Sequence, residues 1–506
     1  MQWKANKTRK EITSQTINKM SFQNQSGDLM PFAEVVPESA QFGAPEKSSI
    51  LTQRRRCRVT PQTGPSIGSA GAGAGGQQVQ FLIADQGGLL DMRSVVLNYT
   101  IQTSGAATPC PDDGHPFMTF QALLNGQLLE NIQNAPKLAN IEMTMGGSKT
   151  YYQTAGSLQG FELLNDDLDD LVPTSASVNT SWGYVVGNQT DCAARSSRAS
   201  AAVFNNIAGE QRSIPLGLIS GLGRMKQYLP VALTGELAFV LITGQANDVL
   251  FATSSSTAGD YSLSNISIEY DIVVPDARYM AVLQKIAMED GQGLVMPYES
   301  SIVTTGAAIS TSATLTENSI IVSRATNNLL RASVVQIPTT AVSLLGFPSQ
   351  SCFGHAGTYS VQFRIGSQVY PQVAAQGDAA LFNMSLAAYG SVMQENGSVT
   401  NRCLWGNSTN GATAGTPAVY ETAIVASGGS VKWAYADRFV PTYGFQVVKG
   451  AAEPLAVDGV SLAGASGSQL IVSLVQAPGV AYTPYVVLTA LKFIKAQGGA
   501  VSVVGA

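Results

Sequence analysis

"FQALLNGQLLENIQNAPKLANIEM", residues 120–143, is echoed by "VQFRIGSQVYPQVAAQGDAALFNM", residues 361–384, with no gap needed between the two. Neighbouring stretches repeat in the same order: "GGLL" at residue 87 matches "NNLL" at residue 327, and "GELAFVL" at 235 matches "SQLIVSL" at 468. Solenoids and propellers repeat every 20–50 residues, whereas these copies lie about 240 residues apart. The echo therefore predicts two whole domains of one fold in tandem.

Apolar and polar residues alternate within both copies. In residues 95–101 and 266–272 every second residue is apolar, so these apolar side chains would share one face of a strand. Residues 359–365 and 485–493 show the same alternation. Side chains on a strand point to opposite faces in turn, so each run predicts a strand with one face toward a core. The pattern favours a β-sandwich or barrel.

Helical signals are few and short. Residues 275–291 predict one helix, with Asp276 as its N-cap and Gly291 as its end. Shorter helices are expected near 135–143 and 378–388, one after each echo. Long polar connections, residues 148–212 and 391–436, then interrupt both halves after the same element, as a duplicated fold would show.

The N-terminal segment before Gln77 differs from the rest. It holds ten of the 29 basic residues against five acids, and it closes with the glycine-rich stretch "GPSIGSAGAGAGG", residues 64–76. We interpret residues 1–76 as a basic arm with a flexible tether, residues 77–300 as the first domain and residues 301–506 as the second. Because the arm has no periodic apolar face, deleting residues 1–60 is then expected to leave the oligomer intact but to impair larger assembly or its salt sensitivity.

One basic cluster lies in this arm. It could contact nucleic acid or anionic lipid, or act as a nuclear localisation signal. The alternative is that it forms a solvated tail. Its arginines are Arg54, Arg55, Arg56 and Arg58.

Composition indicates the kind of partner. Charged residues make up only 12% of the chain, and a surface so poor in charge predicts extensive contact with other protein. The most apolar runs are about half the ~20 residues that a helical membrane span needs, and we identify no secretory signal. Five scattered cysteines argue against a disulfide framework and for a reducing compartment.

Residue patterns for chemistry are weak, so no catalytic, cofactor or metal site is predicted. His115 lies in "CPDDGHP" with Cys110, Asp112 and Asp113, a mix that could bind a metal but is more typical of a polar turn. "GPSIG" around Ser66 matches a nucleophile elbow only in letters, and "GGSKT" at 146–150 lacks the glycines of a phosphate loop. "NDDLDD" at 165–170 lacks the spacing of a calcium loop.

The sequence resembles the double jelly-roll major capsid proteins of DNA viruses, the lineage of virophages, Polinton-like viruses and large eukaryotic viruses. Three stretches carry the resemblance: residues 212–242, with "IPL" leading to "YLP" and an apolar strand; residues 266–283; and residues 362–371. The likeness covers roughly residues 77–506. It implies an all-β fold of two tandem eight-stranded jelly-roll β-sandwiches, with a few short helices and long loop insertions.

The resemblance also implies a function. Three copies would form a homotrimer, a nearly hexagonal capsomer that tiles an icosahedral shell, with neighbouring capsomers, penton proteins and minor capsid proteins as partners. The insertions would face outward, and the arm would face genome or internal membrane. The protein would be a non-enzymatic part of the virion, assembled in the reducing interior of the host cell.

Two alternatives remain open at this point. A tandem β-sandwich fibre or adhesin would share the strand pattern, although a cell-surface protein would normally carry a secretory signal. A jelly-roll carbohydrate-active protein would need paired carboxylates in an aromatic groove, and neither half concentrates Asp, Glu and Trp together.

Overall fold

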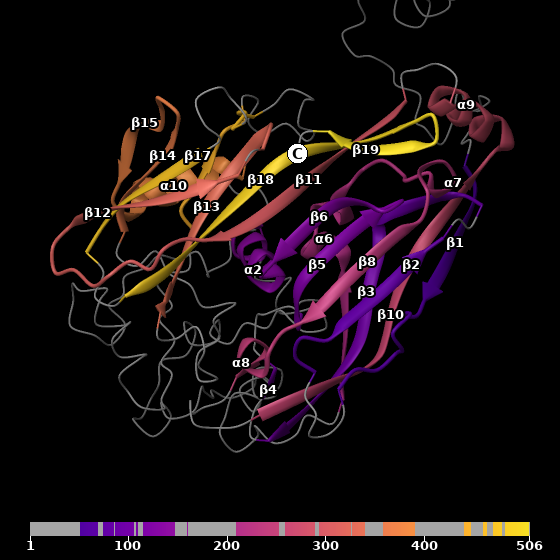
Figure 1. Ribbon diagram of the computed structural model, residues 1–506, viewed down its shortest axis with the longest axis horizontal. Helices are drawn as coiled ribbons and strands as arrows, with labels where there is room; N and C mark the ends of the chain where they lie inside the picture. Colours follow the sequence, from indigo (N-terminus) through magenta and orange to yellow (C-terminus); the bar gives the residue numbers. More distant parts are fainter. Residues whose placement is uncertain are drawn as a thin grey trace, which may run out of the picture. The chain divides into compact units, whose positions relative to one another are not determined.

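The computed structural model describes most of the chain from Leu51 onward (Figure 1). The described residues are 51–68, 74–84, 87–105, 108–109, 115–146, 159, 209–251, 259–288, 293–324, 326–339, 358–389, 440–446, 459–462, 469–477 and 481–504. No helix in this part of the chain is long and apolar enough to cross a membrane.

The first half forms a sandwich of two four-stranded antiparallel sheets. One sheet has the order β1-β10-β3-β7 and the other has the order β2-β8-β5-β6. The eight strands are β1 (Leu51–Val59), β2 (Gln78–Ile83), β3 (Leu89–Gly105), β5 (Phe117–Leu124), β6 (Gln127–Gln133), β7 (Glu210–Pro215), β8 (Leu237–Thr243) and β10 (Gly259–Pro275). A short pair, β4 (Thr108–Pro109) and β9 (Leu250–Phe251), lies beside them.

The second half repeats this topology strand for strand. Its sheets have the orders β11-β18-β13-β16 and β12-β17-β14-β15, and β19 pairs with β18. The strands are β11 (Leu294–Thr305), β12 (Thr316–Ser323), β13 (Leu329–Pro338), β14 (Thr358–Ile365), β15 (Gln368–Gln376), β16 (Thr442–Gly444), β17 (Gln469–Gln476), β18 (Tyr482–Gln497) and β19 (Ala500–Val504). The all-β prediction of two eight-stranded jelly-roll sandwiches is confirmed.

The sequence echo falls on equivalent elements. The hairpin β5–β6 of the first sandwich corresponds to the hairpin β14–β15 of the second, and the two hairpins keep the same spacing between their strands. The predicted helices also form: α2 (Ala135–Gly146) follows β6, and α10 (Asp378–Ala388) follows β15. Both long connections start after these helices and lie mostly outside the described residues.

The remaining helices are short connections. They are α6 (Leu216–Ile219), the 3₁₀ turn η4 (Gly221–Arg224), α7 (Val231–Thr234), α8 (Ala246–Val249) and α9 (Ala277–Met288). Helix α9 joins the two sandwiches, and the Asp276 carboxylate accepts a hydrogen bond from the Arg278 backbone N–H at 2.8 Å. This is the predicted N-cap.

Part of the predicted arm belongs to the first sandwich. Residues 51–59 form β1, an edge strand that pairs with β10 from Leu51 opposite Pro275 to Val59 opposite Ile268. Half-buried Cys57 and Val59 pack against the core, which gives this basic segment an inward face. Removing residues 1–60 would therefore remove a jelly-roll strand, and from the structure we expect this deletion to destabilise the fold.

The predicted tether is also partly packed. Ile67 is buried and exchanges two backbone hydrogen bonds of 2.9 Å with Leu263. Ala74 is buried as well, and the Gly76 N–H donates to the Thr243 carbonyl. Gly64 and Gly68 have positive φ, so these glycines form turns. Residues 69–73 lie outside the described part.

The two sandwiches share buried apolar residues. One core fills the first sandwich and extends into the second through side chains such as Tyr298 and Ile494, while a smaller core lies within the second sandwich. Strand β13 serves both, because Val334 belongs to the smaller core and Val335 to the shared one. The sandwiches are therefore joined by a packed junction as well as by the connection through α9.

Candidate functional site: the basic strand and the junction cluster

The predicted basic cluster lies on β1, where two of its four arginines pair with carboxylates. Arg54 contacts Asp271 at 2.7 Å and Asp91 at 2.9 Å, whereas Arg56 contacts Glu269 at 2.9 Å. The acids come from the neighbouring strands β10 and β3. The hydrogen bond to Asp271 raises the pKa of Arg54 above its ordinary value.

These ion pairs change what the cluster can do. Arg54 and Arg56 face three carboxylates, those of Asp91, Glu269 and Asp271, so the positive charge of these two arginines is balanced within the chain. All four arginines are exposed, and Arg54 and Arg56 fasten an edge strand through cross-strand pairs. Contact with nucleic acid or a membrane through Arg54, Arg55, Arg56 and Arg58 stays a prediction.

The other sequence motifs form no catalytic or metal-binding group among the described residues. His115 is buried, while Cys110, Asp112 and Asp113 lie outside the described part, as do residues 147–150 and "NDDLDD". Ser66 is exposed and does not lie between a strand and a helix. Within the described ranges, no group of three His, Cys, Asp or Glu side chains could hold a metal ion.

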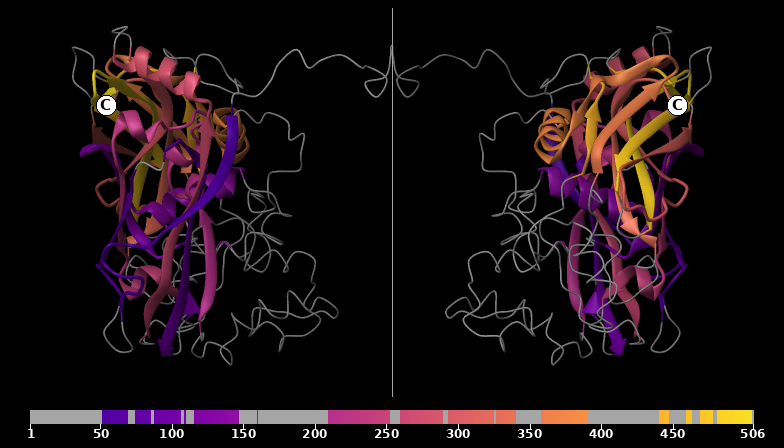
Figure 2. Two further views of the ribbon diagram at one scale, coloured as in Figure 1. Left: turned by 90° about the vertical axis from the view of Figure 1, so that its right-hand side faces the viewer. Right: turned by 90° about the vertical axis from the view of Figure 1, so that its left-hand side faces the viewer.

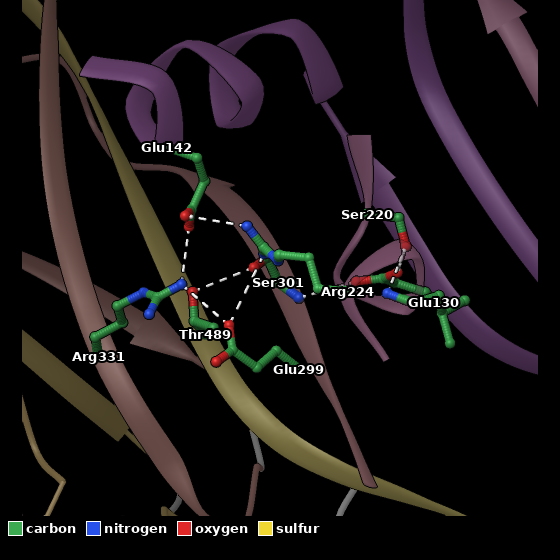
Figure 3. Close-up of polar contacts among 9 residues, drawn as sticks. Glu130, Glu142, Ser220, Arg224, Glu299, Ser301, Arg331 and Thr489 are labelled. Carbon is green, nitrogen blue, oxygen red and sulfur yellow. Dashed lines mark hydrogen bonds and ion pairs between the residues drawn. The ribbon is translucent and has the colours of Figure 1, made fainter. Parts of the chain in front are cut away.

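A polar cluster that the sequence analysis missed lies at the junction of the sandwiches (Figure 3). We call it the junction cluster. The first sandwich contributes residues from β6, α2 and the α6–η4 turn, and the second contributes residues from β11, β13 and β18. Its members are Glu130, Glu142, Ser220, Arg224, Glu299, Ser301, Arg331 and Thr489.

Four charges alternate in sign within the junction cluster. The Arg331 guanidinium donates to Glu142 at 2.9 Å and to Glu299 at 3.1 Å. Arg224 approaches the same two carboxylates, with N–O distances of 3.2 Å to Glu142 and 3.8 Å to Glu299. Two cations and two anions leave no net charge in this partly buried place, and paired charges are the form in which ions are tolerated away from water.

The directions of the pKa shifts follow from these ion pairs. Burial alone would raise the pKa of the Glu142 carboxyl, but Arg331 and Arg224 outweigh it and hold the pKa below its usual value. Burial alone would lower the pKa of Arg331, but Glu142 and Glu299 outweigh that effect and raise it. The side chain of Arg331 also lies over the Tyr389 ring, 4.9 Å from its centre.

Glu130 differs from the other two carboxylates of the junction cluster, because it forms no salt bridge within the described residues, although Arg224 and Lys492 act on it electrostatically. Its carboxylate accepts hydrogen bonds from the Ser220 hydroxyl and, at 3.1 Å, from the Ser301 backbone N–H. Burial raises the pKa of Glu130 to about 7, against the opposing effect of these two hydrogen bonds. The side chain therefore joins a turn of the first sandwich to β11 of the second and titrates near neutral pH.

Close backbone packing accompanies the polar contacts. A Cβ added to Gly221 would overlap the backbone carbonyl of Glu299, so only glycine lets η4 approach β11 this closely. The Tyr298 hydroxyl donates to the Leu129 carbonyl at 2.8 Å, and the Lys137 ammonium lies 4.6 Å from the centre of the Tyr485 ring. Each of these contacts links one sandwich to the other.

No protein-family model matches this sequence, and no curated protein matches it. Solved structures do match. VP54 of PBCV-1, fitted into a reconstruction of the virophage Sputnik, superposes with a TM-score of 0.53 over 92% of this chain and 99% of its own, at 12% identity. The Faustovirus major capsid protein gives a TM-score of 0.51 over 90% and 93% of the two chains, at 9% identity.

A third structure, that of the Sputnik virophage, gives a TM-score of 0.50 at 12% identity over 94% of this chain and 93% of its own. The chain has the double jelly-roll fold of viral major capsid proteins. The likeness therefore spans both sandwiches and the connection between them. At these identities it is the fold that is shared.

Proposed function

We propose that this chain is a major capsid protein whose copies form homotrimeric capsomers that tile an icosahedral virus shell. The observation that carries the proposal is the duplication: two sandwiches with the same strand order occur in one chain with the fold of capsid proteins. Three such chains would supply six similar sandwiches, enough for a nearly hexagonal block.

The junction supports this use. A shell subunit must keep its shape while neighbours press on several sides, and two sandwiches with a shared core and a partly buried ionic cluster meet that need. The few charged residues of the chain, 12%, fit a surface that is largely covered by neighbouring protein. We propose a structural role without enzymatic activity.

Strand register supports an orientation for the subunit. The long connection of the first sandwich returns at the start of β7, where Glu210 pairs with Ile101 near the end of β3. The opposite end of the same sheet holds Leu51, which pairs with Pro275 just before α9. We propose that the insertion end faces outward and the α9 end faces the interior.

The remaining partners follow from that orientation. Residues 1–50 would reach genome, internal membrane or minor capsid proteins from the inner face, and capsomers would meet one another and penton proteins at their sides. The protein would reside in the virion capsid after assembly in the reducing interior of a host cell. The half-buried free thiol of Cys57 is compatible with that compartment.

Electron microscopy of the expressed full-length protein tests the proposal against its alternatives. Hexagonal blocks or closed shells would support the capsid role. Elongated fibres would favour a tandem β-sandwich adhesin, and isolated globules would favour a jelly-roll carbohydrate-active protein. Either of the last two outcomes would contradict the proposal.

A further inference from the structure

The first sandwich carries a counterpart of the second sandwich's part of the junction cluster. Arg331 directly follows "NNLL" in the sequence, and Asp91 directly follows the matching "GGLL". The strand register agrees, because Thr489 on β18 pairs with Arg331 and with β11. In the same way, Asp271 on β10 pairs with Asp91 and with β1. The ion pairs of β1 therefore occupy, on the first sandwich, the position that the junction cluster has on the second.

These equivalent surfaces differ in how far they are covered. Val335 on β13 is fully buried in the core that the sandwiches share, whereas Val96 on β3, its match in the repeated "SVV", is only half-buried. The side chain of Arg331 is 10% exposed in the junction, whereas that of Arg54 is 55% exposed. We call the outer side of β1, β10 and β3 the β1 face. It is built like the covered surface of the junction but remains accessible.

A second accessible surface lies on the other sandwich. In the junction, β6 and α2 contact the second sandwich, and residues 135–141 of α2 are all buried. The equivalent elements of the second sandwich are β15 and α10, which we call the α10 face. Val373 on β15 is 84% exposed, more than any other large apolar residue in the described part of the chain. The α10 face thus presents apolar side chains where the first sandwich buries them.

Helix α10 has the composition of a covered helix. Only three of its eleven residues are polar, so apolar side chains lie on all of its sides. Helices of this kind are normally buried. Of residues 380–388, however, only three are buried, namely Leu381, Ser385 and Ala388. The composition of α10 therefore indicates that a further surface covers this helix.

The charges of the two faces are compatible. The echo aligns the exposed Asn383 on α10 with Glu142 on α2, the carboxylate to which Arg331 donates. Asp91 stands on the β1 face where the junction has Arg331. A carboxylate at position 383 would therefore meet a like charge, and the neutral amide of Asn383 avoids that repulsion.

A single chain cannot join its own two faces. Strands β15 and β1 lie at opposite ends of residues 51–506 (Figure 1), and the two views of Figure 2 look at these ends in turn. Different faces that fit each other form a head-to-tail contact, which closes into a ring when its rotation allows. We propose that the α10 face of one copy covers the β1 face of the next, so that the junction is repeated between chains. This inference rests on the proposed homotrimer and names the two faces that form it.

The test is the mass of full-length variants in solution, at a concentration where wild type has the mass of three chains. Val373→Arg on the α10 face and Val96→Arg on the β1 face should each reduce the mass to that of one chain, because each places a charge in a desolvated contact. Ile321→Arg is the matched control, since Ile321 is 59% exposed on β12, the opposite edge strand of the sheet that holds β15. It should keep the mass of three chains.

Mixing the two variants tests whether the faces meet each other. Each variant keeps the face that the other has lost, so an equimolar mixture should form a species of two chains and stop there. The double variant Val96→Arg, Val373→Arg should keep the mass of one chain in every mixture. Far-UV circular dichroism confirms that each variant is folded.

Two results would overturn the inference while the homotrimer stands. Variants that keep the mass of three chains would show that other faces form the trimer. A mixture that stays at the mass of one chain would show that these two faces do not bind each other. Wild type with the mass of one chain would instead contradict the homotrimer itself.

Discussion

The guanidinium of Arg331 on β13 donates to the carboxylate of Glu142 on α2 at 2.9 Å, across the junction of the two sandwiches. The two residues are 189 positions apart and belong to different jelly rolls. Because Glu299 and Arg224 complete a neutral set around them, the pair fixes how the halves meet. The proposed capsomer would need such a fixed geometry.

Removing Arg331 should therefore destabilise the protein. Arg331→Met leaves the partly buried carboxylates of Glu142 and Glu299 with Arg224 as their remaining partner, and we expect a loss of about 1–3 kcal/mol in the free energy of unfolding. Denaturant unfolding measures it. The control is Arg364→Met, since Arg364 is exposed on β14 and should cost roughly 0.5 kcal/mol or less. Similar losses for both variants would show that the junction cluster does not hold the sandwiches together.

Glu130 should make stability fall as the pH rises. Its folded pKa of about 7 lies above the ordinary 4.5, so its protonated form is favoured in the folded state. This contribution, on the order of 3 kcal/mol, is present below pH 4.5 and lost as the pH rises through about 7. Glu130→Gln should flatten the curve of unfolding free energy against pH in that range. An unaltered curve would mean that Glu130 is charged at neutral pH.

His115 should act in the opposite direction. Burial lowers its pKa from 6.5 to about 3, so the neutral imidazole is favoured in the folded state. Its contribution, on the order of 5 kcal/mol, is present above pH 6.5 and lost as the pH falls toward 3. Acid unfolding followed by circular dichroism should move to lower pH in His115→Gln. A midpoint that does not move would assign acid unfolding to other groups.

Two truncations test where the first sandwich begins. Deleting residues 1–50 should leave the melting temperature unchanged, whereas deleting residues 1–60 removes β1 and exposes the edge of β10. The longer deletion should lower the melting temperature by several degrees or abolish soluble expression. Equal melting temperatures for the two proteins would show that β1 adds nothing to the fold.

Much of the fold could be predicted because the chain repeats itself. The echo at residues 120–143 and 361–384 marks the same hairpin and helix in each sandwich, and α10 has the predicted bounds 378–388. Alternation also identified inward side chains such as Tyr99 and Tyr270, which are buried. Tyr359 is an exception: it is 43% exposed, because the pairing of β14 with β17 shifts between Thr358 and Ser360.

The junction could not be predicted in the same way. Periodicity shows which face of a strand is apolar, but Glu142 and Arg331 meet only through tertiary packing. The alternation predicted for residues 485–493 is wrong: residues 484–491 of β18 are all buried, as a continuous apolar run indicates for a strand covered on both faces. The sequence also contained an indication of the role of β1. Glu269 and Asp271 alternate with apolar residues on β10, and they form ion pairs with Arg56 and Arg54, respectively, which are likewise two residues apart on β1.

The mass of the full-length protein in solution tests the central claim most directly. Static light scattering at micromolar concentration should give three times the mass of one chain, which is 52.9 kDa. A stable species of that size would agree with a trimeric capsomer of six sandwiches. A single species with the mass of one chain at the same concentration would contradict it.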